Sequence, residues 1–238
     1  MNAVYHHTRD VHSLRGAVAG FRYLSTFGPF QSLLDVGAGT GTWMSAAYRA
    51  GVSDVWGVDL IQCEPDNETV KACKFQAVDA SRPFDLQRTF DCVICLEVGE
   101  HLEERVARTL IASVCRHGNL VFFSAARPGQ WGQNHINCQW PAYWQNLFNA
   151  EGFGCFDDVR WGMWNDRDIE PWYRQNIFRA VRDSNSAGSE PRVLPVLHPE
   201  MMDVQQQSCV PGNARKWIRR PQILKSLEAM FRKSIGDR

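Results

Sequence analysis

Asp35 stands two residues before three glycines at alternate positions, Gly37, Gly39 and Gly41. Glycine lacks a Cβ, so a turn built on it can adopt positive φ and bring the backbone close to a ligand. A carboxylate in this turn would repel a pyrophosphate bound at a helix N-terminus, but it would stabilise a ligand with an ammonium or sulfonium group. The turn therefore indicates a nucleotide-like cofactor with a cationic end.

Further acids follow at the ends of later strand-like runs. The run 55–60 contains Asp59, the run 75–80 contains Asp79, and the run 90–102 contains Glu97 before a Glu-His-Leu ending. A carboxylate after the second strand can accept hydrogen bonds from both hydroxyls of an unphosphorylated ribose. The alternative is that these acids only form turns and caps.

Together, the glycine turn, the later acids and the Glu-His-Leu ending resemble the class I S-adenosylmethionine-dependent methyltransferases. The resemblance implies an enzyme that uses S-adenosylmethionine. It also implies that Asp79 receives the adenine amino group and that Glu97 faces the methionine end. The cofactor-binding residues would come from the carboxyl ends of four strands: Asp35, Gly37, Ala38, Gly39, Gly41, Asp59, Leu60, Asp79, Ala80, Leu96 and Glu97.

The loop 125–140 is rich in amides and contains two tryptophans, and it follows the fifth predicted strand. Its stretch 132–139, followed by Tyr143-Trp144, resembles a loop in a branch of small-molecule methyltransferases. His135 is the candidate general base for a hydroxyl acceptor, because ligands bind at this edge of such sheets; a histidine that only orders the loop is the other interpretation. The predicted acceptor contacts share polar or aromatic side chains: Trp131, Gln133, Asn137 and Tyr143.

The acceptor class follows from what the fourth strand lacks. It ends in Leu96-Glu97-Val98-Gly99, without the Asn/Asp-Pro-Pro-aromatic or Pro-Cys sequences expected of nucleic-acid base methyltransferases, and the formal net charge is zero. We therefore expect no nucleic acid. The amide- and Trp-rich loop favours a hydroxyl of a sugar, glycan or natural product, because aromatic faces pack on sugars and amides bond hydroxyls. A non-catalytic S-adenosylmethionine-binding protein is one alternative. An NAD-dependent oxidoreductase is another, although its glycine spacing would be Gly-x-Gly-x-x-Gly.

Hydrophobic periodicity predicts alternating strands and helices, as in a doubly wound α/β sheet. The resemblance implies that this α/β fold is the Rossmann-like class I methyltransferase fold. We expect a seven-stranded, mostly parallel sheet with an antiparallel seventh strand and helices on both faces. The predicted strands cover 32–36, 55–58, 74–78, 91–96, 119–124, 153–161 and 174–181. The predicted helices cover 11–28, 42–50, 66–73 and 103–116, and a further one begins at Pro141 and runs to Gly152.

Composition suggests a methyltransferase domain over 1–183 and a loop-rich tail over 184–238. Residues 211–238 hold eight basic and two acidic side chains, a balance of +6 (8 − 2), and an apolar stripe at helical spacing. This pattern predicts a basic amphipathic C-terminal helix that docks on the core, binds a second subunit in a homo-oligomer, or lies on an anionic surface.

Cysteine usage and hydropathy set the remaining expectations. The eight cysteines are scattered, and the only close pair, Cys92-x-x-Cys95, lies inside a predicted strand without a second pair at ligand spacing. No metal is therefore expected. No secretory signal and no apolar run of membrane-spanning length are visible, so we expect a cytoplasmic protein without a transmembrane segment.

Overall fold

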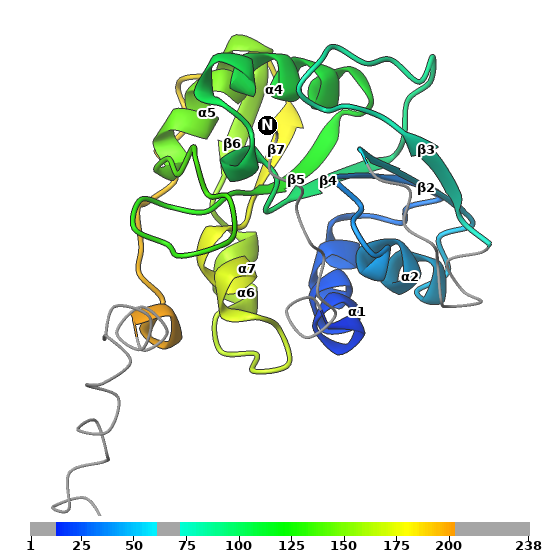
Figure 1. Ribbon diagram of the computed structural model, residues 1–238, viewed down its shortest axis with the longest axis horizontal. Helices are drawn as coiled ribbons and strands as arrows, with labels where there is room; N and C mark the ends of the chain where they lie inside the picture. The colour runs from blue at the N-terminus through cyan, green and yellow to red at the C-terminus, as the bar shows by residue number, and fades with distance from the viewer. Residues whose placement is uncertain (1–12, 61–71, 203–238) are drawn as a thin grey trace, which may run out of the picture. The chain divides into compact units, whose positions relative to one another are not determined.

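A computed structural model describes residues 13–60 and 72–202, and these residues form a seven-stranded sheet (Figure 1). The strand order is β3-β2-β1-β4-β5-β7-β6. The first five strands are parallel, whereas β7 runs antiparallel to both β5 and β6. The strands are β1 Ser32–Val36, β2 Asp54–Asp59, β3 Lys74–Ala77, β4 Cys92–Leu96, β5 Leu120–Ser124, β6 Phe153–Phe156 and β7 Phe178–Arg182. This arrangement confirms the predicted class I methyltransferase fold.

Helices cover both faces of the sheet (Figure 1). One face carries α1 Leu14–Leu24, α2 Thr42–Arg49, α6 Val159–Met163 and α7 Pro171–Asn176, and the other carries α4 Ala107–Arg116 and α5 Pro141–Ala150. Short 3₁₀ turns lie at Ser25–Phe27, Gly99–His101 and Glu104–Val106. In the parts of the chain that the structure describes, no helix is long and apolar enough to cross a bilayer.

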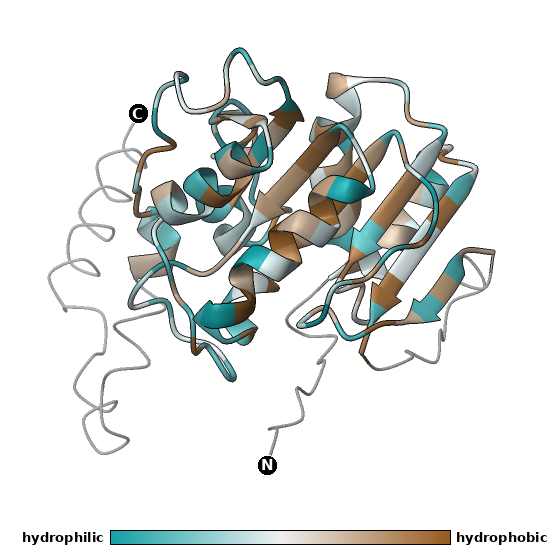
Figure 2. Cartoon of the chain, turned by 90° about the horizontal axis from the view of Figure 1, so that it is seen from above, coloured by the Kyte–Doolittle hydropathy of each residue, from teal (hydrophilic) through white to brown (hydrophobic). Residues whose placement is uncertain are grey.

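Two buried clusters form the core because successive strand residues point to opposite faces. Leu33, Ile94 and Phe122 pack with α1 and α2. Their neighbours Leu34 and Val93 pack with α4 and α5 on the other face. The central strands are accordingly largely apolar in Figure 2. This double burial makes the sheet a rigid platform whose carboxyl edge positions the loops.

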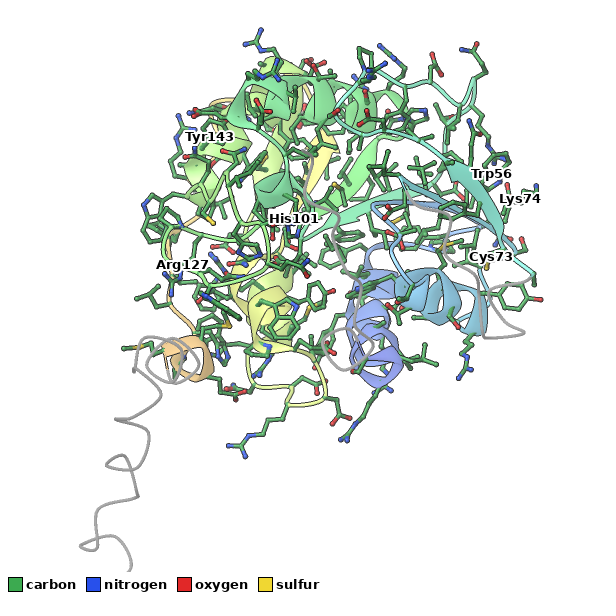
Figure 3. All side chains as sticks on the ribbon, viewed as in Figure 1. Trp56, Cys73, Lys74, His101, Arg127 and Tyr143 are labelled. Carbon is green, nitrogen blue, oxygen red and sulfur yellow. The ribbon has the colours of Figure 1, made fainter. Side chains whose placement is uncertain are left out.

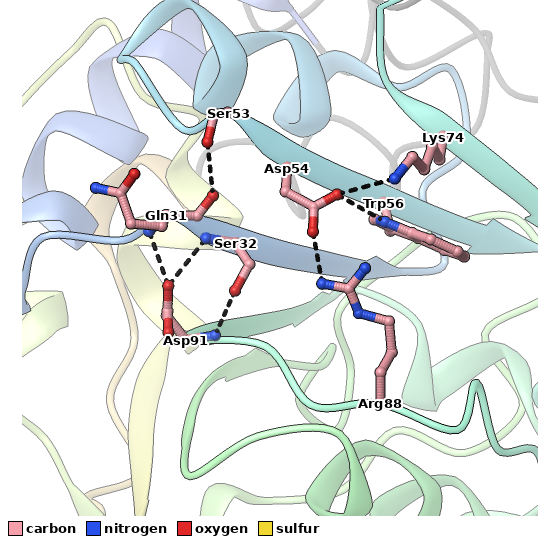
Figure 4. Close-up of polar contacts among 8 residues, drawn as sticks. All are labelled: Gln31, Ser32, Ser53, Asp54, Trp56, Lys74, Arg88 and Asp91. Carbon is pink, nitrogen blue, oxygen red and sulfur yellow. Dashed lines mark hydrogen bonds and ion pairs between the residues drawn. The ribbon is translucent and has the colours of Figure 1, made fainter.

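Polar side chains fix the opposite, amino-terminal edge of the sheet (Figure 4). The Asp91 carboxylate accepts hydrogen bonds from the backbone amides of Gln31 and Ser32 at 2.8 and 2.9 Å, and Ser32 Oγ accepts one from Asp91 N at 3.0 Å. Asp54 accepts from Arg88 Nη2 at 2.5 Å and also pairs with Lys74. The Asp91 contacts hold the starts of β1 and β4 together, and the Asp54–Lys74 pair joins the starts of β2 and β3.

Two boundaries differ from the sequence prediction. The sixth strand stops at Phe156 because Val159–Met163 form α6, where the buried Arg160 donates to Gln175 O at 2.8 Å and Leu194 O at 3.0 Å. The predicted start of the seventh strand at Arg174 is also wrong. Pro171 occupies the first turn of α7 instead, a position that favours helix. The predicted helix over 66–73 falls mainly on 61–71, outside the described residues.

The segment 184–201 has little regular structure but packs on the sheet domain. The Glu190 carboxylate accepts from Gln145 Nε2 and Asn149 Nδ2, both at 2.7 Å, and from Cys155 N at 3.1 Å. Burial alone would raise the pKa of Glu190, but these bonds lower it to about 2. The compact unit that holds the sheet therefore continues to Met201. The predicted C-terminal helix lies outside the described residues.

Candidate active site

The glycine turn after β1 has the conformation that its sequence requires. Gly37, Gly39 and Gly41 have φ values of 80, 52 and 74°. The backbone amides of Gly37 and Ala38 both donate to Val58 O, at 2.8 and 3.1 Å, which ties the turn to the end of β2. A Cβ on Gly37 would lie 2.3 Å from Val98 Cγ2. Glycine thus allows both the left-handed backbone and the close approach of the loop after β4.

A hollow opens beside this turn. It is lined by side chains and backbone from the turn, the start of α2, the end of β4 and α7: Asp35, Gly37, Ala38, Gly39, Thr40, Thr42, Trp43, Leu96, Glu97 and Tyr173. Six of the residues predicted from sequence therefore meet in one place, at the carboxyl edge of the sheet where ligands of such folds bind.

Asp35 is the buried acid of this hollow, with a relative exposure of 4%. Burial, and then the negative charge of Asp59, raise its pKa to about 8. The side chain is therefore mostly protonated at neutral pH. A cationic group in the hollow would favour the charged form and release this proton.

The remaining predicted cofactor acids lie at the ends of β2 and β3. Asp59 Oδ2 accepts a hydrogen bond from Gly39 N at 2.9 Å, which places this carboxylate against the glycine turn. Asp79 Oδ1 accepts from Ser81 N at 3.0 Å and from Ser81 Oγ at 2.6 Å. Asp79 thus shapes its own turn, and its contact with adenine stays a prediction.

The other predicted cofactor residues differ in their exposure. Leu60 follows β2 and is 66% exposed, whereas Ala80 is half-buried after β3. Gly41 does not line the hollow; it precedes the first residue of α2 and supplies the left-handed backbone there. Leu60 and Ala80 stay predictions for the adenine side of the site.

Glu97 connects the hollow to the acceptor loop. Its φ is 55°, and its carboxylate accepts from Gln130 Nε2 at 3.0 Å and from Asn176 Nδ2 at 3.1 Å. Asn176 Nδ2 also donates to Gln130 Oε1 at 3.0 Å. This network joins the end of β4, the loop after β5 and the end of α7. Sequence reasoning missed Gln130 and Asn176, because only the fold brings these amides to Glu97.

Sequence reasoning also missed two aromatic residues of the hollow, Trp43 and Tyr173. Their rings meet edge to face with centroids 5.2 Å apart. Trp43 is the second residue of α2, and Tyr173 lies on α7, a helix that the sequence pattern did not predict. The position of Trp43 directly after the glycine turn was the one sequence signal that an aromatic side chain lines the hollow.

His135 lies beside His101, with ring centroids 5.1 Å apart in an edge-to-face arrangement. Its Nδ1 is 3.1 Å from Gln130 O. The loop is seated on the turn after β4, because Ile136 N and Asn137 N both bond Glu100 O, at 2.8 and 3.0 Å. In Figure 3, His101 lies near the centre of the molecule, on this turn. His135, the predicted general base, therefore lies close to the side of the hollow that Glu97 lines.

Glu100 is a fully buried acid under this loop. Burial, and then the nearby Glu97 carboxylate, raise the pKa of Glu100 well above its usual range. Potential ligand atoms of Glu100, His101 and His135 lie within 4.8 Å of one another. Sequence analysis did not bring these three residues together.

The predicted acceptor contacts divide into two kinds. Trp131 is 74% exposed and Gln133 is also exposed, so both side chains are accessible on the loop. Asn137 is buried; its Nδ2 lies 3.4 Å from Gly99 O, and its Oδ1 accepts from Gln139 Nε2 at 3.1 Å. Tyr143 is half-buried, with its ring 5.0 Å from that of Trp144. Asn137 therefore orders the loop from within.

Comparison with known proteins decides the family. A family model described as a methyltransferase domain matches residues 5–174. The chain belongs to this family. It is a class I S-adenosylmethionine-dependent methyltransferase domain, and its cofactor is S-adenosylmethionine. No curated protein sequence matches this methyltransferase domain protein.

Solved structures with TM-scores above 0.5 share its fold. Magnesium protoporphyrin IX methyltransferase from Synechocystis PCC 6803, with bound S-adenosylhomocysteine, is 18% identical with a TM-score of 0.53 and matches 76% of this chain and 90% of its own. CalS10, an amino pentose methyltransferase from Micromonospora echinaspora, is 16% identical with a TM-score of 0.52 over 76% and 99%. The glycopeptide N-methyltransferase MtfA is 21% identical with a TM-score of 0.41, and the match spans 50% of this chain but only 57% of MtfA.

Proposed function

We propose that this protein transfers a methyl group from S-adenosylmethionine to a hydroxyl of a small polar acceptor, a sugar, glycan or natural product. The observation that carries the cofactor half is the buried Asp35 carboxyl in the hollow beside the glycine turn. A cationic ligand compensates the cost of burying that carboxylate, and the methionine end of S-adenosylmethionine supplies an ammonium.

The reaction needs alignment more than covalent help. The acceptor oxygen attacks the methyl carbon, the carbon–sulfur bond breaks, and the sulfonium becomes the neutral thioether of S-adenosylhomocysteine. The hydroxyl proton leaves at the same time or shortly afterwards. Holding oxygen, methyl and sulfur in line is worth up to roughly 7–11 kcal/mol in favourable cases. The network of Glu97, Gln130 and Asn176 supports such alignment, because it fixes the acceptor loop against the cofactor hollow.

His135 is the residue that we propose to act on the hydroxyl proton. It lies on the loop that this network holds, and its Nδ1 faces a carbonyl oxygen, which can only accept. Nδ1 therefore carries the proton and Nε2 keeps the lone pair that a base needs. A general base is typically worth about 10²–10⁴-fold in rate.

Accessible side chains on the same loop support a polar ring-shaped acceptor. Trp131 offers an exposed aromatic face, on which sugar rings pack, and Gln133 offers an amide for hydroxyl groups. The alternative function is binding of S-adenosylmethionine without catalysis, since the hollow and its acids say nothing about turnover.

Methyl release over a panel of sugars, glycans and phenolic natural products, read as S-adenosylhomocysteine formation, tests the proposal. With an active acceptor, His135→Ala should lower turnover by about 10²-fold or more while calorimetry shows unchanged S-adenosylhomocysteine binding. Ile136→Ala, the exposed neighbour, is the matched control and should keep its activity. Cofactor binding without turnover of any acceptor would support the non-catalytic alternative.

A further inference from the structure

The geometry points to a metal site: we propose that Glu100, His101 and His135 bind one divalent transition-metal ion. The three residues come from two segments, the 3₁₀ turn after β4 and the loop after β5. One potential ligand atom of each residue lies within 4.8 Å of the corresponding atoms of the other two. The proposal rests on this cluster and on the surroundings of Glu100.

The spacing is close to that of a bound ion. Imidazole nitrogen and carboxylate oxygen lie roughly 2.0–2.2 Å from zinc, so two ligand atoms at the tetrahedral angle around one ion are about 3.4 Å apart. The ligand atoms of the cluster lie within 4.8 Å of one another, so they reach this distance when side-chain rotations bring each pair closer by at most about 1.4 Å. Two imidazoles and one carboxylate suit Mn²⁺ or Zn²⁺ better than Mg²⁺, which prefers oxygen ligands.

The Glu100 carboxyl is the independent second observation. It is fully buried, and neither of its oxygens makes a hydrogen bond of normal geometry among the described residues, although the backbone amides of Glu100 and Ala126 and the Glu97 carboxyl lie close enough to affect its pKa. Glu97 lies near enough to affect its charge, and the two acids have no ion pair with any lysine or arginine in 13–60 and 72–202. Buried carboxylates are normally paired or bind metals. A cation beside Glu100 would supply the missing partner.

Both histidines are already held in place. His135 Nδ1 donates to Gln130 O at 3.1 Å, the kind of carbonyl contact that orients imidazoles in metal sites. His101 closes the 3₁₀ turn Gly99–His101, with its backbone amide 3.1 Å from Val98 O. The same turn is fixed to the acceptor loop by the two bonds to Glu100 O. The three side chains therefore need little ordering to bind an ion.

The ion would also change how the hydroxyl proton is removed, and this step rests on the proposed function. Three protein ligands leave positions for an acceptor oxygen, and a divalent ion lowers the pKa of an oxygen bound to it. The acceptor would then lose its proton to solvent before attack, and His135 would act as a ligand instead of a base. Glu97, which lines the cofactor hollow, places this ion next to the methyl donor.

The test is to titrate the chelator-treated full chain with metal ions. Mn²⁺ binding is detected by electron paramagnetic resonance, and Zn²⁺ binding is measured by calorimetry. We expect one ion per chain. Glu100→Gln and His135→Ala should each weaken binding by at least about 100-fold, since changes even outside the ligand set cost 10–100-fold. Glu103→Gln, the same change at an exposed acid three positions on, is the control and should bind like the wild type.

Thermal melting and S-adenosylhomocysteine binding, measured on the same samples, separate metal loss from misfolding. Glu100→Gln keeps the shape of the side chain and removes no ion pair of the described residues, so we expect it to fold. Failure of Mn²⁺ and Zn²⁺ to bind at millimolar concentration, or binding that neither variant weakens, would overturn the metal site. S-adenosylhomocysteine binding and turnover that persist in the metal-free protein would then leave the proposed function intact, with His135 as the base.

Discussion

Replacing Asp35 with asparagine should stabilise the fold while it damages cofactor binding. The pKa of Asp35 is raised from 3.8 to about 8 in the folded chain. Between these pH values the folded state keeps a proton that the unfolded state has lost, so stability falls by about 1.4 kcal/mol per pH unit as pH rises. At pH 7, 3.2 units above 3.8, the accumulated cost is about 4 kcal/mol.

Asparagine cannot ionise, so Asp35→Asn should recover much of this free energy at pH 7 and nothing at pH 3. Urea unfolding at pH 3, 5, 7 and 9 measures the difference. Asp168→Asn, which removes an exposed partner of Arg15, is the control and should change stability by less than about 1 kcal/mol. A wild-type stability that does not fall between pH 5 and 7 relative to Asp35→Asn would refute the buried-carboxyl argument.

Asp35→Asn should stabilise the fold but weaken cofactor binding. If the ligand ammonium requires ionised Asp35, only about 1% of the wild type is competent at pH 6, two units below the pKa of about 8. The dissociation constant of S-adenosylhomocysteine should therefore improve about tenfold per pH unit up to pH 8 and then level off. In Asp35→Asn, binding should be weak and independent of pH between 6 and 8. Equal wild-type affinity at pH 6 and pH 8 would exclude Asp35 as the cationic contact.

Two further predictions concern the ribose acid and the tail. Asp59→Ala should weaken S-adenosylhomocysteine binding about tenfold or more in calorimetry, because charged hydrogen bonds contribute roughly 1.5–3 kcal/mol; it should also lower the pH at which binding levels off, since Asp59 helps to raise the pKa of Asp35. An unchanged dissociation constant would remove Asp59 from the site. For the predicted basic tail, ending the chain after Val210 should lower the melting temperature or the oligomeric mass if the tail docks on protein. Loss of salt-sensitive binding to anionic vesicles, with stability unchanged, would indicate a surface-binding tail instead.

The cofactor half of the candidate site could be predicted from sequence because its main residues are close together in the chain. Asp35 and the glycines lie close together in the chain, and glycine permits the three positive φ values that the turn adopts. The ends of β2 and β4 could be located because parallel strands bring their carboxyl ends to one edge. Leu96 and Glu97 therefore reached the hollow as expected.

The acceptor half could not be predicted in the same way. Glu100 and His135 meet only because the loop after β5 folds back on the turn after β4 through backbone bonds to Glu100 O. No short ligand spacing exists to signal that contact. Tyr173 was missed for another reason: the seventh strand predicted from sequence begins at Arg174, inside α7, although Pro171 marks a helix start.

Glu190 also covers part of the edge of the sheet where another copy of the chain could pair with β6. β6 is the last strand of the sheet, and such an edge offers unpaired backbone groups to any passing strand. The Glu190 carboxylate occupies the Cys155 amide of β6 and places a charge there. A chain that ends at residue 183 would lose Glu190. We expect such a chain to aggregate through its exposed β6 edge, although it keeps every residue that lines the cofactor hollow.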